Sequence, residues 1–171
     1  MWDQVLRTLQ HEFSDVPDVE QLTRIVLRFV LAVVLGALIG YDRERAESTA
    51  GLRTHMLVAL GTAMFVLVSQ QAGLDAEGMS RVIQGLLAGI GFLGAGAVIK
   101  LSETGQVRGL TTAAGLWSTA AIGMTVGLGR EMTAVIATLF VLAILALVLR
   151  WEHYAELKQG ARRNEHATTE D

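Results

Sequence analysis

Long stretches without charge alternate with short clusters of charged residues along most of this chain. Residues 82–99, 109–129 and 132–149 contain no Asp, Glu, Lys or Arg and are 18, 21 and 18 residues long. A helix needs about 20 apolar residues to cross the hydrocarbon of a bilayer. Its backbone polar groups bond one another there, where water is absent. The pattern therefore predicts membrane-spanning helices.

The predicted fold is all-α: an integral membrane bundle of five transmembrane helices, preceded by an amphipathic interfacial helix. The five spans are expected at about 22–41, 54–71, 81–99, 109–128 and 132–149. The amphipathic helix is indicated by apolar residues at helical spacing, namely Trp2, Val5, Leu6, Leu9 and Phe13. This division gives an amphipathic segment at 1–17, a membrane domain at 18–151 and a short polar cytoplasmic tail at 152–171.

The composition narrows the classes of function. The chain of 171 residues is 51% hydrophobic, and its net charge of -3 says little because the charges lie at predicted helix ends. The sequence has no basic patch with interleaved aromatic residues, so nucleic-acid binding is not indicated. The absence of cysteine excludes disulfides, thiolate chemistry and cysteine-based metal sites.

Small residues predict which helices pack closely. Within 81–99, three glycines share one side of a helical wheel and two lie on the other, so two neighbours can approach. We therefore expect this helix at the centre of the bundle. The glycines assigned to helix packing are Gly36, Gly40, Gly85, Gly89, Gly91, Gly94, Gly96, Gly115, Gly123 and Gly127.

The last two predicted helices differ in character. In the fourth, small residues recur every four positions, at Thr111, Gly115, Thr119, Gly123 and Gly127. They predict a second close seam, with the two hydroxyls bonding across helices. The fifth is almost entirely large and aliphatic, which predicts that it faces lipid.

A charged segment, 41–53, follows the first predicted span. Asp42 and Glu44 are carboxylates of the kind that Mg²⁺ prefers. Residues two apart on a helix point about 200° apart, so both reach one ion only if the helix ends here. The simpler interpretation is a solvated helix end, with Asp42 paired to Arg45 and Arg43 paired to Glu47. The pattern establishes no cofactor, and Mg²⁺ is the ion that these carboxylates would suit.

Three further polar side chains are candidates for function. Arg53 is expected to neutralise Asp42 or Glu44 across the loop. His55 is either a proton sensor or, as we favour, a helix-start histidine bonded to backbone or to a lipid headgroup. Arg28 lies within the first span, and snorkelling or a structural pair is favoured over an intramembrane functional charge. The candidate cytoplasmic binding cluster is Asp42, Arg43, Glu44, Arg53, Thr54 and His55.

The orientation follows from Lys and Arg in the short loops. With five crossings, one side collects nine such residues: Arg43, Arg45, Arg53, Lys100, Arg108, Arg150, Lys158, Arg162 and Arg163. Cytoplasmic loops carry the excess of positive charge. The N-terminus is therefore predicted outside and the C-terminus in the cytoplasm.

Four phrases, in this order and spacing, resemble the MgtC/SapB family of bacterial inner-membrane proteins. They are GALIGYDRERAESTAGLRTHMLVALG, QGLLAGIGFLGAGAVIK, VRGLTTAAGLW and AAIGMTVGLG, and the resemblance covers roughly residues 25–150. It implies a five-helix membrane domain and a role in growth at low magnesium, with virulence in some relatives. MgtC itself continues into a C-terminal domain resembling ACT domains. This chain is instead expected to be SapB-like, a membrane domain alone.

Two functions follow as hypotheses. The first is a non-enzymatic membrane protein for adaptation to low magnesium and ion homeostasis, acting through a membrane-protein partner. The resemblance implies such partners, the membrane ATP synthase among them. The second is a small transporter or channel for a cation or other solute. An enzyme is disfavoured, because no Ser/His/Asp set, HExxH or GxSxG occurs. Small-residue seams also predict a homo-oligomer.

Overall fold

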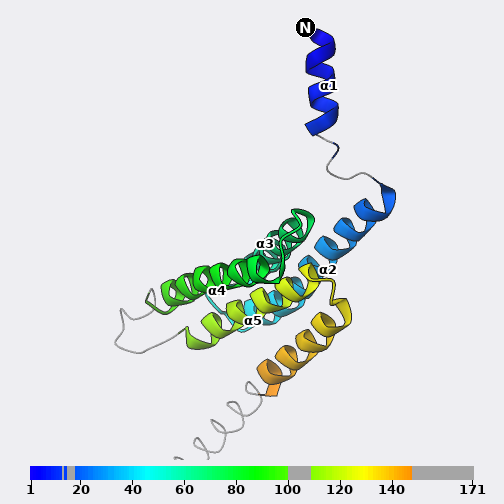
Figure 1. The fold of residues 1–171 in the computed structure, drawn as a ribbon. Helices are drawn as coiled ribbons and strands as arrows, with labels where there is room; N and C mark the ends of the chain where they lie inside the picture. Colours follow the sequence, from blue (N-terminus) through cyan, green and yellow to red (C-terminus); the bar gives the residue numbers. More distant parts are fainter. Residues whose placement is uncertain (13, 15–17, 100–108, 148–171) are drawn as a thin grey trace, which may run out of the picture.

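All regular structure in the described part of the chain is helical. The computed structural model describes residues 1–12, 14, 18–99 and 109–147. The helices are α1 (Trp2–Glu12), α2 (Val19–Arg45), α3 (Leu52–Gln71), α4 (Ala76–Ile99), α5 (Leu110–Gly127) and a last helix, Glu131–Leu147 (Figure 1). The all-α prediction is confirmed for these residues. The predicted 100–108 loop and 152–171 tail lie outside them.

The ends of α2 show how local sequence sets its length. The side chain of Asp18 accepts a hydrogen bond from the backbone N–H of Gln21 at 2.6 Å, which caps the first turn. Glu20 and Arg24 form an ion pair one turn apart. At the other end α2 continues to Arg45, one turn beyond the predicted span, so the charges at 42–45 are helical.

The centre of the bundle is α3, which lies between α2 and α5. A Cβ added to Gly36 of α2 would lie 2.7 Å from the carbonyl oxygen of His55. One added to Gly123 of α5 would lie 2.9 Å from the Cα of Ala59. Only glycine allows such close backbone approach, and in a membrane this van der Waals packing holds helices together. Gly40 and Gly127 make equally close approaches to α3.

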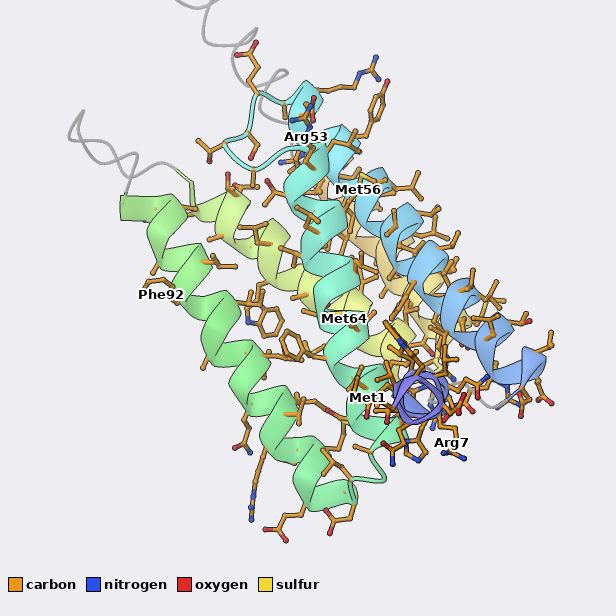
Figure 2. The ribbon with its side chains drawn as sticks, turned by 90° about the horizontal axis from the view of Figure 1, so that it is seen from above. Met1, Arg7, Arg53, Met56, Met64 and Phe92 are labelled. Carbon is orange, nitrogen blue, oxygen red and sulfur yellow. The ribbon has the colours of Figure 1, made fainter. Side chains whose placement is uncertain are left out.

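The prediction that residues 81–99 lie at the centre is wrong. Only 11% of the most apolar window of α4 is buried, against 33% for α3. A Cβ on Gly85, Gly89, Gly91 or Gly96 would meet nothing within 4 Å. The physical reason is that small residues permit close approach without selecting a neighbour. The α3 helix is flanked by the glycines of α2 and α5, and α4 lies at the edge (Figure 2).

The last helix, Glu131–Leu147, faces lipid on one side only. Ala134, Thr138 and Leu145 are buried, and the first and last of these join the core formed with α2, α3 and α5. Met132 and Phe140 are 72% and 67% exposed. The prediction of a wholly lipid-facing helix is therefore corrected to a half-buried one.

Within the described residues, three helices are long and apolar enough to cross a membrane: α2, α3 and residues Ala76–Val98 of α4. The last helix is apolar but shorter in its described part. The exact count of five crossings stays a prediction. The short helix α1 has no buried residue and stands apart from the bundle (Figure 1).

Candidate functional site at the charged end of the bundle

Polar side chains meet where α2 ends and where α3 and α5 begin. Arg43, His55 and Thr112 come from these three helices and are 5%, 0% and 6% exposed. The Oγ atoms of Ser48 and Thr112 lie 2.8 Å apart and share a hydrogen bond, which ties the turn after α2 to α5. Buried polar groups of this kind need partners. We call the buried Arg43, His55 and Thr112, together with the half-buried Asp42 and Ser48, the buried polar cluster.

Arg43 is buried together with its own neighbour in the sequence. Its Nε donates to Oδ2 of Asp42 at 3.0 Å, and its Nη2 donates to the same oxygen. The expected pairs of Asp42 with Arg45 and of Arg43 with Glu47 are wrong. Arg45 lies instead over the ring of Tyr41, 5.2 Å from its centroid, in a cation–π contact.

Glu44 caps α3. Its Oε2 accepts a hydrogen bond from the backbone N–H of Leu52 at 2.8 Å, so the carboxylate sits at the positive end of that helix. A Cβ on Gly51 would lie 2.8 Å from the same oxygen, so a larger residue here would displace the end of the Glu44 side chain.

The two carboxylates considered for magnesium therefore do not share a site. Asp42 is paired to a guanidinium and Glu44 is bonded to a helix end. No group of three or more His, Cys, Asp or Glu that could hold a metal ion occurs among the described residues. Magnesium binding by this pair stays a prediction.

The side chain of His55 is buried, and one of its two ring nitrogens is hydrogen-bonded. Its Nδ1 lies 2.9 Å from the carbonyl oxygen of Gly51, and because a carbonyl only accepts, Nδ1 is the donor. Its Nε2 is buried and has no hydrogen-bond partner among the described residues. A Cβ on Gly115 would lie 3.4 Å from that nitrogen, so α5 packs directly against it. This geometry is that of the backbone-bonded histidine favoured from the sequence.

Arg53 and Thr54 do not join the buried polar cluster. Both are exposed, and both line a separate apolar groove between α3 and α4. The expected neutralisation of Asp42 or Glu44 by Arg53 is wrong, because those carboxylates have the partners given above. Arg53 has no ion pair or hydrogen bond to any described residue.

Two members of the buried polar cluster, Ser48 and Thr112, were missed. The four-residue repeat selected Thr111, which is exposed, whereas its neighbour Thr112 is buried. Thr119 is buried but donates to the carbonyl oxygen of Gly115 in its own helix at 2.8 Å, so it does not bond across helices. A spacing of three then four, from 112 to 115 to 119, identifies the buried face of α5 correctly.

A second polar cluster closes the opposite end of the bundle. Arg28 of α2 donates from Nε to Glu131 at 3.3 Å, and from Nη1 to the carbonyl oxygen of Gly127 at 3.1 Å and to Gln70 at 3.4 Å. One guanidinium thus joins α2, α3, α5 and the last helix. Among the interpretations left open for Arg28, these contacts correspond to the structural pair.

These features define a helical membrane protein. Apolar helices carry most of the surface, and buried charges are tied into pairs near the helix ends. Residues 29–154 match the model of the MgtC family, and the chain belongs to that family.

Relatives at substantial identity support the assignment. Protein SrpB of Synechococcus elongatus is 42% identical over 147 residues, covering 80% of this chain and 81% of SrpB. Protein MgtC of Salmonella typhimurium is 45% identical over 117 residues, covering 68% of this chain and 49% of MgtC. Protein MgtC of Brucella abortus is 46% identical over 117 residues. The chain thus spans about half the length of the MgtC relatives. No solved structure matches.

Proposed function

We propose that this protein is a non-enzymatic component of the bacterial inner membrane that supports adaptation to low magnesium through a membrane-protein partner. In this proposal it crosses the bilayer five times, with the N-terminus outside and the C-terminus in the cytoplasm. The charged end of the bundle then faces the cytoplasm. The protein also self-associates through small-residue helix faces.

The observation that carries the proposal is family membership over residues 29–154. The geometry adds support, because the polar side chains at the charged end are engaged in structural contacts. Asp42 binds Arg43, Glu44 caps α3, and Ser48 binds Thr112. A protein built in this way presents a rigid end to a partner.

Deletion and complementation across a magnesium titration test the role. The deletion strain is expected to grow normally in millimolar magnesium and poorly in micromolar magnesium, and the wild-type chain restores growth. Growth that is unchanged by deletion at every magnesium concentration contradicts the role.

Purified protein in liposomes tests the mode of action. No magnesium, sodium or proton flux is expected under any imposed gradient, whereas cross-linking in cells is expected to trap a second membrane protein. Flux carried by this chain alone overturns the partner-dependent mode in favour of a small cation or solute transporter.

A further inference from the structure

An apolar groove runs along the surface between α3 and α4. It encloses about 770 Å³ and is walled by apolar side chains, with Phe65 on α3 and Ile90 on α4 among them. Its α4 wall includes Gly85 and Gly89, where an added Cβ would meet nothing within 4 Å. Figure 2 shows α4 diverging from α3 toward the end at which Arg53 is labelled.

The dimensions of the groove decide what it can hold. From Arg53 to Phe65 on α3 is about 18 Å at 1.5 Å per residue, a little more than one leaflet of a hydrocarbon core about 30 Å thick. The side chains that line the groove between these ends are almost all apolar, and its length matches that of one acyl chain in a single leaflet.

The charges at its two ends differ. Arg81 at one end is already paired with Glu77. Arg53 at the other end is exposed and unpaired among the described residues, and the hydroxyl of Thr54 lies beside it in the sequence. One end therefore carries a cation that no described residue neutralises, with a hydroxyl next to it in the sequence. Basic pockets between membrane helices of this kind suit anionic lipid headgroups.

We propose that this groove binds an anionic phospholipid, with one acyl chain between α3 and α4 and the phosphate held by Arg53 and Thr54. The binding is independent of the magnesium role and depends on membrane insertion alone. The proposed orientation assigns the lipid to the cytoplasmic leaflet. A wild-type chain that binds no lipid in the groove yet supports growth at low magnesium would refute this site only.

The test is lipid retention by the purified full chain. The protein is exchanged into mixed micelles containing equal amounts of phosphatidylglycerol and phosphatidylethanolamine, re-isolated, and the bound lipid quantified by mass spectrometry. The wild type is expected to retain phosphatidylglycerol preferentially. Arg53→Gln should lower that preference about fivefold, the worth of one basic residue near a lipid surface, and Arg53→Lys should keep most of it.

A variant that fills the groove distinguishes lipid binding within the groove from attraction of lipid by charge at the surface. The double variant Gly85→Leu, Gly89→Leu should lose both lipids, because its side chains enter the groove. Gly96→Leu is the matched control, since it lies on the same helix in open space but does not line the groove. It should retain lipid as the wild type does. Should the double variant fail to fold, the comparison of Arg53→Gln with Arg53→Lys decides.

Three results would overturn the proposal. These are equal retention of the two lipids by the wild type, unchanged retention in Arg53→Gln, and equal loss in the Gly96→Leu control. A fourth comes from Leu57→Cys, which adds a single cysteine to the groove of a chain that has none. Disulfide-linked dimers of this variant in membranes would show that a second copy occupies the groove instead.

Discussion

Replacing Gly36 with alanine tests whether α3 is the central helix. The new Cβ would lie 2.7 Å from the carbonyl oxygen of His55 and 2.9 Å from the Cβ of Ala59. Ordinary contact begins at 3.4 Å, so α2 and α3 would have to separate by about 0.7 Å. Neither obstructing atom belongs to a side chain that can rotate away. Overpacking of this kind costs about 1–3 kcal/mol, and the upper half of that range is expected here.

The matched variant is Gly91→Ala on α4, where a Cβ would meet nothing within 4 Å. Alanine favours a helix over glycine by about 1 kcal/mol, and this gain applies to both variants. It cancels in their difference, which isolates the packing term. Gly36→Ala should therefore be less stable than Gly91→Ala by about 2–3 kcal/mol.

Unfolding in mixed micelles measures this difference. Purified variants are titrated with sodium dodecyl sulfate, helicity is followed by circular dichroism, and free energies are taken from the midpoints and slopes. The wild type should lie between the two variants. If Gly91→Ala lowers stability as much as Gly36→Ala does, then α4 packs closely on its glycine side and the bundle centred on α3 is refuted.

Three further pairs of substitutions probe the polar contacts at the two ends of the bundle by the same unfolding assay. Arg28→Ala should lower stability by about 1–3 kcal/mol through lost charge-assisted hydrogen bonds, whereas Arg24→Ala, which breaks an exposed pair, should change it by less than about 1 kcal/mol; equal effects would contradict the structural role of Arg28. Thr112→Val should cost about 1 kcal/mol and Thr111→Val nothing measurable, and the reverse order would show that the wrong face of α5 is buried. Glu44→Ala should lower stability by about 1 kcal/mol, whereas Glu44→Gln, which keeps an acceptor oxygen for the α3 cap, should lower it less. If both variants lose the same stability, and added magnesium changes the stability of the wild type alone, the result would point to metal binding instead.

The sequence predicted those parts of the structure that depend on local pattern. Uncharged runs set the helix positions to within a few residues, because length and apolarity are properties of one segment at a time. The start of α2 likewise depends on a local contact, since the side chain of Asp18 caps a backbone N–H three residues on. The backbone bond of His55 is equally local, since its partner lies one turn away.

The predictions that failed concerned which residue or helix would be the contact partner. Arg43 was expected to reach along the helix to Glu47 and instead holds the adjacent Asp42, and the side chain of Arg43 is 6% exposed while that of Asp42 is 26% exposed. The glycines of α4 were expected to pack, and most face open space. A small residue shows that close approach is allowed, but the partner is chosen by the shapes of all the helices together, which no single segment contains.

The central position of α3 links the two polar ends of the molecule. At one end its first turn receives Glu44 and holds His55, and at the other Gln70 meets the guanidinium of Arg28. Glycines of α2 and α5 fix its two flanks along the length between. The α4 helix has no comparable close contact on its groove side. A change in lipid or partner is therefore expected to move α4 before it disturbs the rest of the bundle, and the groove between α3 and α4 is the place where the membrane can act on the fold.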